Sequence, residues 1–320
     1  MEAARPFGLS LNSGPMIPYL RQFDFAYGRR DQVSPLIQRV IADNPGPFTF
    51  TGTGVYIVGR DRPGAEVAVI DPGPMDETHL SALLRAIEGR TVSHILVTHT
   101  HRDHAPLARP LAEAVGGAPI LAARPPGRTV HASGALDEDD DADFQPDVIL
   151  VGGERIEGDG WTLEALATPG HASNHMAFVL RDENALFSGD HIMGWSTTVV
   201  APPDGDMADY MKSLDAVLAR GFSTIWPTHG PAITQVAPFL KAYRAHRLER
   251  EAQIMARLAS GDRMVADMVP ALYAGVDQRL WPAAGLSVLA HLIKLEKEGR
   301  VRASPGAELA ATWRLVDPAL

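Results

Sequence analysis

The stretch THTHRDH, residues 98–104, lies at the end of the apolar run HILVT. His99 and His101 are two residues apart, so in an extended or loosely turned backbone both imidazoles can point to one side and share a metal ion. Asp103 and His104 follow on the next turn and can face a second ion. Chance would produce H-x-H-x-D-H in roughly one sequence per thousand of this length, so the motif predicts a metal site.

Three other apolar runs also lead into a ligand-type side chain. ALATPGH ends at His171, LFSGD ends at Asp190, and TIWPTHG contains His229. Because sites in open α/β frameworks form where strands end, we expect these side chains to join those of the heptapeptide. The candidate ligands are then five His and two Asp. Zinc takes about four ligands, so two ions that share a bridging carboxylate and a bridging hydroxide would use all seven groups.

The surrounding pattern predicts an α/β body. Short apolar runs such as EVAVI (66–70) and MAFVL (176–180) are typical of strands. Residues 76–89 and 206–221 have an acidic start, a helical pattern and a terminal Gly. Beyond about residue 240 the chain predicts three helices and a hairpin around Ser304-Pro-Gly, which indicates a winged-helix module. We therefore expect a catalytic domain over 1–240 and a winged-helix-like domain over 241–320. The length agrees with two domains, because a typical domain has about 150 residues and the chain has 320.

Five motifs carry a family resemblance. VIDPG around Asp71, THTHRDH, TPGHASNH, FSGD and PTHG resemble, in this order, the motifs of the metallo-β-lactamase superfamily. NPGPFTFTGTGVYIVG, GDHIMGWSTTVV and HLIKLEKEGRV are similar to its β-lactamase-like protein 2 branch, whose members append a winged-helix-like domain. The resemblance covers nearly the whole chain from about Arg39. It implies an αββα sandwich followed by a small winged-helix-like domain, two zinc ions and hydrolysis.

The resemblance also implies a division of the ligands. His99, His101 and His171 would hold the first metal, and Asp190 would bridge the two ions. The second metal would be held by Asp103, His104 and His229. Ligand chemistry alone leaves Fe or Mn possible in place of zinc, because His and carboxylate sites accept all three.

Composition narrows the class of protein. The chain has no Cys, which excludes disulfides, thiolate nucleophiles and sulfur-ligated metals. It has no apolar run of about 18 residues and no visible secretory signal, so we expect a cytoplasmic protein that does not enter the membrane. Residues 1–240 hold 17 Lys/Arg against 30 Asp/Glu, and an acidic body disfavours polyanions. The acidic run LDEDDDAD (136–143) is interpreted as a solvated loop.

The sequence leaves competing functions open. The first is a dinuclear zinc hydrolase in which a metal-bridging hydroxide attacks a small ester, thioester or lactone. The alternative is a single-stranded RNA endonuclease with the same metal mechanism, a substrate class that the family branch implies. Two further alternatives are a nucleic-acid-binding regulator without activity and a mononuclear iron oxygenase, and the complete ligand set argues against both. The sequence sets no oligomeric state.

Several single residues have two readings. Asp103 and His175 are the catalytic candidates, and His175 can either give a proton to the leaving group or hydrogen-bond a neighbouring loop. Asp71 is either a turn residue or the acceptor that orients a ligand His. His191, next to Asp190, can contact substrate or point away. In the tail, four cations can contact phosphates or form a solvated face: Lys294, Lys297, Arg300 and Arg302.

Overall fold

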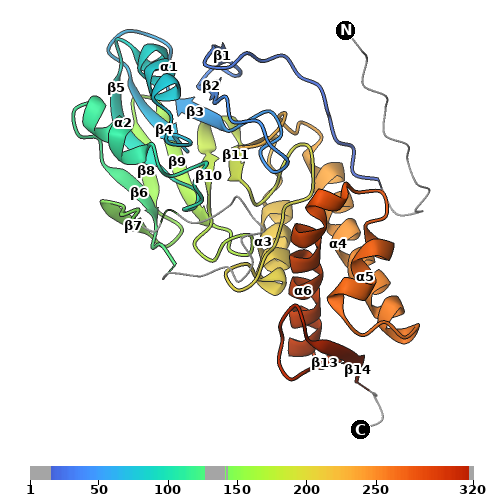
Figure 1. The fold of residues 1–320 in the computed structure, drawn as a ribbon. Helices are drawn as coiled ribbons and strands as arrows, with labels where there is room; N and C mark the ends of the chain where they lie inside the picture. The colour runs from blue at the N-terminus through green and yellow to red at the C-terminus, as the bar shows by residue number, and fades with distance from the viewer. Residues whose placement is uncertain (1–15, 127–140, 142, 317–320) are drawn as a thin grey trace.

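The computed structural model describes residues 16–126, 141 and 143–316, and Figure 1 shows their course. Two sheets stack face to face in its main body. The first has seven strands in the order of the sequence: β1 (Arg30–Gln32), β2 (Ile37–Ile41), β3 (Gly54–Val58), β4 (Glu66–Ile70), β5 (Thr91–Leu96), β6 (Ile120–Ala123) and β7 (Val148–Leu150). Strands β1 to β4 pair antiparallel, and β4 to β7 pair parallel.

The second sheet has five strands in the order β12-β11-β10-β9-β8. Their bounds are β8 (Arg155–Gly158), β9 (Trp161–Ala167), β10 (Met176–Leu180), β11 (Ala185–Gly189) and β12 (Thr224–Pro227). A short 3-10 helix, η1 (Arg181–Glu183), joins β10 to β11. Only the β11–β12 pair of this sheet is parallel, so the loops after these two strands emerge at the same edge.

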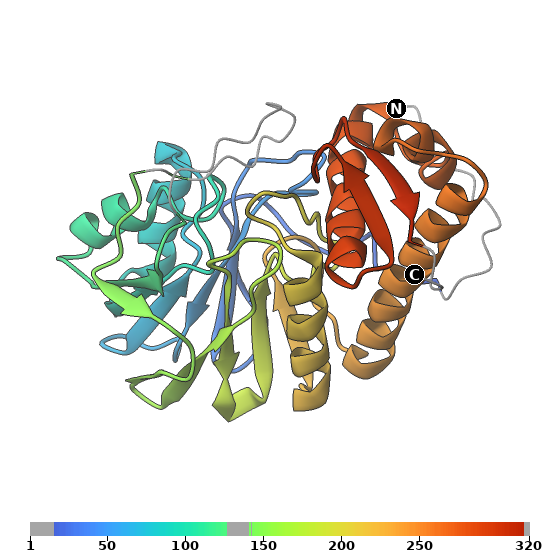
Figure 2. The same ribbon diagram turned by 90° about the horizontal axis from the view of Figure 1, so that it is seen from below.

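Apolar side chains from both sheets fill the space between them. Tyr56 of β3 and Phe187 of β11 are at most 1% exposed, and their ring centroids lie 5.0 Å apart. Helices α1 (Glu77–Ile87) and α2 (Ala108–Ala114) pack on the outer face of the first sheet. Helices α3 (Met207–Arg220) and α4 (Val236–Ala259) pack on the outer face of the second. Figure 2 shows the resulting αββα sandwich edge on, which confirms the predicted fold class.

The C-terminal module has its own core, centred on the buried Trp313. It contains α5 (Val265–Leu272), η2 (Gln278–Leu280), α6 (Trp281–Lys297), and the hairpin of β13 (Val301–Ser304) and β14 (Thr312–Leu315). This confirms the predicted winged-helix arrangement of helices and a hairpin. Both views show α6 beside α3 of the sandwich. No helix in the described part of the chain is long and apolar enough to span a bilayer.

Helix α4 runs through the domain boundary expected at residue 240. Phe239 and Tyr243 near its start pack with the second sheet and α3. Ile254 and Leu258 near its end belong to the core of the C-terminal module. The two parts therefore share a continuous helix, and the division into 1–240 and 241–320 stays a prediction.

The predicted strands and helices appear with small shifts at their ends, but several elements are not predicted from the sequence, among them β2, α2 and β8. The buried strand β2 reads IQRVI, in which Gln38 and Arg39 interrupt the apolar pattern although both are buried. Helix α2 has only seven residues and includes Pro110, so it carries little helical signal. Strand β8 has a single buried residue, Ile156. Most of the acidic run 136–143 lies outside the described residues.

Asp206 links the two parts of the molecule at the start of α3. Its side chain accepts hydrogen bonds from Ala208 N at 2.7 Å and Asp209 N at 3.0 Å, which caps the helix. The same carboxylate pairs with Lys297 of α6 at 2.5 Å. Because Lys297 is 59% exposed, the cap contributes more stability than the ion pair does.

We expect Asp206→Ala to destabilise the protein by about 1–2 kcal/mol, because the amides of Ala208 and Asp209 in the first turn of α3 lose their hydrogen-bond acceptor. Thermal unfolding should then start several degrees lower, as followed by circular dichroism. Asp215→Ala is the matched control, since Asp215 lies on the same helix and pairs with Arg244 at the surface without capping. An equal midpoint for Asp206→Ala and the unchanged protein would contradict the capping role.

Candidate metal centre

The site lies where β5, β9, β11 and β12 end, at one edge of the sandwich. The loop after β5 carries the heptapeptide, and it is held in a turn because His104 N and Ala105 N both donate to His101 O. Gly189, at the end of β11, has φ +50°, and a Cβ there would lie 2.6 Å from His175 Nε2. Only glycine therefore lets the chain turn at this point and present Asp190.

Three imidazoles converge in a first group. His99 Nε2 lies 2.9 Å from His101 Nδ1, and His171 Nε2 lies 3.3 Å from the same atom. His171 Nδ1 donates to Val199 O at 2.7 Å, which directs its Nε2 into the group. These are the three side chains that the resemblance gives to a first metal, and all are buried.

A second group lies beside the first. His229 Nε2 lies 3.0 Å from Asp103 Oδ2, and His104 Nε2 lies 3.3 Å from that oxygen. His229 Nδ1 donates to Gly52 O at 3.2 Å, so its Nε2 faces Asp103. The three side chains expected at a second metal are thus together, and their ligand atoms lie within 4.8 Å of one another.

Asp190 lies between the two groups. Its Oδ1 is 3.5 Å from His104 Nε2 and 3.4 Å from His229 Nε2. Asp190 also forms a potential metal-binding group with His99 and His104, which connects it to the first cluster. This placement suits the bridging position expected of it.

Two buried ligand atoms without hydrogen bonds give a second indication that these side chains bind metal ions. His104 Nε2 and Asp190 Oδ1 are fully buried, and neither makes a hydrogen bond within the described residues. Burying a polar atom without a hydrogen bond lowers the stability of the fold, and a cation coordinated by both atoms would remove that loss. Imidazole nitrogens and carboxylate oxygens are also the ligands that Zn²⁺ and the related transition metals take in proteins.

Burial keeps two imidazoles of the first group unprotonated. Burial lowers the pKa of His99 well below its ordinary value, and the charge of His104 adds to this effect. Burial and the charge of His171 lower the pKa of His101 to about 3. Neutral imidazoles with free lone pairs are the form that binds metal, so His99 and His101 are ready to coordinate at neutral pH.

Opposite charges dominate the second group. Although burial raises the pKa of Asp103, His104 and His229 hold it well below its ordinary value. Although burial lowers the pKa of His104, the carboxylates of Asp103, Asp190 and Asp71 raise it well above the usual range. A strong field from carboxylates thus acts at the point where a second cation would bind, and the cation would displace the proton of His104.

Asp71 accepts hydrogen bonds from three of the residues that form or flank the site. Its Oδ1 accepts from Thr98 N at 2.7 Å, and its Oδ2 accepts from the hydroxyls of Thr98 and Thr228 at 2.8 and 3.1 Å. Its Oδ2 also accepts from His104 Nδ1 at 2.9 Å. The structure therefore supports the second reading of Asp71, as the acceptor that fixes the tautomer and direction of a ligand His.

His175 does not have the free ring nitrogen that a proton donor requires. Its Nε2 accepts a hydrogen bond from Asp190 N at 3.1 Å, and its Nδ1 lies 2.8 Å from Thr168 Oγ1. The side chain is also only about 1% exposed. Of its two readings, the geometry supports a hydrogen bond to a neighbouring loop, and His175 positions Asp190 instead of contacting a leaving group.

Residues that the sequence did not single out support the loop after Asp190. Thr198 Oγ1 donates to Asp190 O at 2.7 Å, and Thr198 N donates to Tyr243 OH at 2.7 Å. Arg247 of α4, itself buried, donates to Thr198 O. Their spacing from Asp190 along the chain gives no local signal, so only the packing of α4 against this loop reveals them. The ring of His191 lies 4.9 Å from that of Tyr210, and His191 is in none of the potential metal-binding groups.

The other histidines within the described residues belong to none of the potential metal-binding groups. His79 Nε2 lies 3.1 Å from Pro72 O, and His94 Nδ1 lies 3.0 Å from Ser93 Oγ. His246 and His291 are in the region of α4 and α6, away from the ligands. His131 lies outside the described residues.

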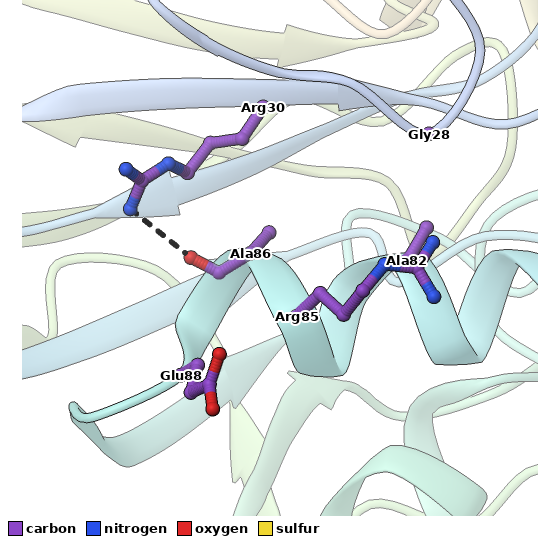
Figure 3. Close-up of a pocket in the computed structure, with 6 residues that line it drawn as sticks. All are labelled: Gly28, Arg30, Ala82, Arg85, Ala86 and Glu88. Atoms are coloured by element: carbon purple, nitrogen blue, oxygen red, sulfur yellow. Dashed lines mark hydrogen bonds between the residues drawn. The ribbon is translucent and has the colours of Figure 1, made fainter.

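A separate cavity of about 510 Å³ opens on the outer face of α1. Figure 3 shows its lining of Arg30, Arg85 and Glu88 with small residues of α1. Arg30 already pairs with Asp61 at 2.8 Å and donates to Ala86 O, and none of the seven candidate ligands borders the cavity. Nothing in its lining points to chemistry.

The chain matches two known protein families and resembles several known proteins. Residues 49–229 match the family described as the Metallo-beta-lactamase superfamily, and residues 265–313 match the Beta-lactamase associated winged helix domain. The Beta-lactamase-like protein 2 homolog of Caenorhabditis elegans is 32% identical over 275 residues, which cover 85% of this chain and 88% of that protein. An Atrochrysone carboxyl ACP thioesterase of Aspergillus chevalieri is 34% identical over 230 residues, covering 71% and 67%. The crystal structure of a Beta-lactamase domain protein from Burkholderia ambifaria has a TM-score of 0.77, 22% identity and coverage of 93% and 97%, which shows the shared fold.

We expect Asp71→Asn to weaken binding of one metal ion by about 10- to 100-fold, the usual cost of losing the acceptor behind a ligand His. Asparagine tolerates the positive φ of this position, 50°, so the fold should persist. Competition with a chromophoric chelator measures the affinity, and circular dichroism checks the fold. Asp147→Asn, at a surface pair with Arg109, is the control. Unchanged affinity in Asp71→Asn would rule out this role.

Proposed function

Because the chain belongs to the metallo-β-lactamase superfamily, we propose that it is a dinuclear metal-dependent hydrolase, with zinc as the metal, that acts on a small acyl substrate. The observation that carries this proposal is the convergence of two ligand groups on one carboxylate. His99, His101 and His171 form one group, and Asp190 lies between it and the second. A hydrolase that used a single ion would not need the second group, which Asp103, His104 and His229 complete.

When bound, the two ions supply Lewis acidity that lowers the pKa of a coordinated water and polarises an acyl carbonyl. The chain's own residues hold that site in a fixed geometry. Asp71 and His175 anchor His104 and the Asp190 backbone, so little reorganisation is needed during reaction. Asp103 has the most exposed side chain in its group, at 18%, and is the ligand that faces entering substrate.

A thioester is the substrate class that we favour among ester, thioester and lactone. One relative is named an ACP thioesterase, and this chain aligns with about two thirds of its length. The net charge of −10 also disfavours a polyanionic substrate through long-range repulsion. That repulsion does not oppose the binding of a small acyl compound.

The tail cations do not form the phosphate-binding face that RNA cleavage would use. Lys294 pairs with Glu251 at 2.7 Å and with Glu298 at 2.6 Å. Arg300 pairs with the same two carboxylates at 2.6 and 3.2 Å, and Lys297 pairs with Asp206. Only Arg302 has no ion pair among the described residues. The cluster is therefore mostly neutralised, and no observation favours the RNA alternative.

Hydrolysis of the butyryl thioester of N-acetylcysteamine tests the proposal. Thiol release can be followed with a thiol reagent, and the enzyme adds no background because the chain has no Cys. We expect about two metal ions per chain, turnover by the metal-loaded protein, and loss of turnover after chelation with recovery when zinc returns. Undiminished turnover without metal, or RNA cleavage without thioester turnover, would contradict the proposal.

Asp103→Asn and His229→Ala should each lower kcat/KM by more than about 100-fold, because loss of a direct ligand exceeds the usual cost of losing its outer partner. Metal content should fall from about two ions towards one in both variants. Arg109→Gln, at an exposed ion pair with Asp147, is the control for purification and loading. Full activity of either ligand variant with one ion per chain would exclude the dinuclear mechanism.

A further inference from the structure

A cavity of about 240 Å³ borders Asp103 at the mouth of the site. Residues 44–49, in the loop between β2 and β3, form one wall, and Arg102 and Asp103 form the other. Complete small-molecule sites usually measure about 300–1,000 Å³, so this cavity takes only part of a substrate. Its position next to a metal ligand makes it a subsite for a group close to the reacting bond.

The wall formed by the loop is fixed by its own hydrogen bonds. Asn44 Oδ1 accepts from Thr53 N at 2.9 Å, and Asn44 Nδ2 donates to Thr53 Oγ1 at 3.0 Å. Thr49 Oγ1 donates to Asn44 O at 2.6 Å. Phe50 stacks on Trp195 with ring centroids 4.9 Å apart and planes 11° apart, which joins this loop to the one after Asp190. The cavity therefore exists before substrate arrives.

The winged-helix module supports the same wall. Phe48, which lines the cavity, packs against a buried cluster of Ala201, Ala283 and Leu286. Ala283 and Leu286 belong to α6 of the C-terminal module. The module thus has a structural part in the subsite, although its cations are occupied by ion pairs.

Arg102 gives the cavity a charge. Its side chain is exposed, and it forms no ion pair or hydrogen bond with the described residues. The neighbouring Asp103 is not its partner, because that carboxylate lies against His229 at 3.0 Å and His104 at 3.3 Å. A free guanidinium at the rim of a partly apolar cavity is suited to a carboxylate or phosphate, which it can bind through two parallel hydrogen bonds.

We propose that Arg102 binds an anionic group of the substrate in this cavity and so makes the enzyme selective for acyl compounds that carry a carboxylate or phosphate near the reacting bond. The inference rests on the proposed acyl hydrolase function and adds the substrate class to it. It also reconciles an anionic substrate with the acidic body, because a single well-placed cation acts at short range where the net charge is screened.

Three thioesters test the proposal on the metal-loaded, full-length protein. Butyryl-N-acetylcysteamine is neutral, glutaryl-N-acetylcysteamine has a carboxylate on the acyl side, and S-butyryl-3-mercaptopropionate has a carboxylate on the thiol side. The measured quantity is the ratio of kcat/KM for each anionic thioester to that for the neutral one. The ratio is taken for the unchanged protein, for Arg102→Gln, Arg102→Lys and Arg102→Glu, and for the control Arg155→Gln on the exposed face of β8.

We expect Arg102→Gln to lower the ratio about tenfold for at least one anionic thioester, the size of effect expected for a hydrogen bond between charged groups. Arg102→Glu should lower it further, Arg102→Lys should retain part of it, and Arg155→Gln should not change it. The affected thioester shows whether the anion lies on the acyl or the thiol side. Unchanged ratios in all Arg102 variants would overturn the inference alone. No turnover of any thioester by the unchanged protein would overturn the proposed function and the inference with it.

Discussion

The buried carboxylate of Asp71 is the point on which the rest of the site depends. It accepts hydrogen bonds from Thr98 after β5, Thr228 after β12 and His104 in the heptapeptide. These donors come from both sheets, so one side chain ties together the ends of strands that are distant in the sequence. The four donors give both oxygens of the carboxylate hydrogen bonds, which explains how Asp71 can be about 1% exposed. The position of the ligands is thus set by the packing of the two sheets.

The arrangement of charge follows from that burial. A dry site lowers the pKa of His99 and His101, and these imidazoles stay neutral. Asp103 and Asp190 stay ionised because the imidazoles of His104 and His229 lie beside them. The site therefore joins a neutral half and a carboxylate-rich half, and both contain side chains of the kinds that bind metal ions. The same burial restricts access to the side where Asp103 and the loop of residues 44–49 meet solvent.

The sequence predicts this site well because each ligand follows the end of a strand. The end of a strand can be predicted from the sequence as the point where a short apolar run gives way to polar or turn residues. The heptapeptide, TPGH, SGD and PTH all follow that pattern, and the seven residues converge as expected. The sequence predicts less well the groups that act through long-range contacts. His175 is a candidate proton donor in the sequence because it is four residues from His171, but the sequence also allows a hydrogen bond to a neighbouring loop, and its hydrogen bond with Asp190 N is visible only in the structure. Tyr243 and Arg247 reach the loop after Asp190 from a helix about 45 residues away, and no local pattern reveals such contacts.

The winged-helix module contacts the wall of the cavity beside Asp103 through α6 and Phe48, and not through its cations. The proposed chemistry requires two ions in the positions that the ligands define. The most direct measurement is anomalous diffraction at the zinc edge from crystals of the zinc-loaded protein. The dinuclear mechanism predicts two peaks, one among His99, His101 and His171, the other among Asp103, His104 and His229, with Asp190 between them. A single peak, or zinc bound outside these residues, would contradict it.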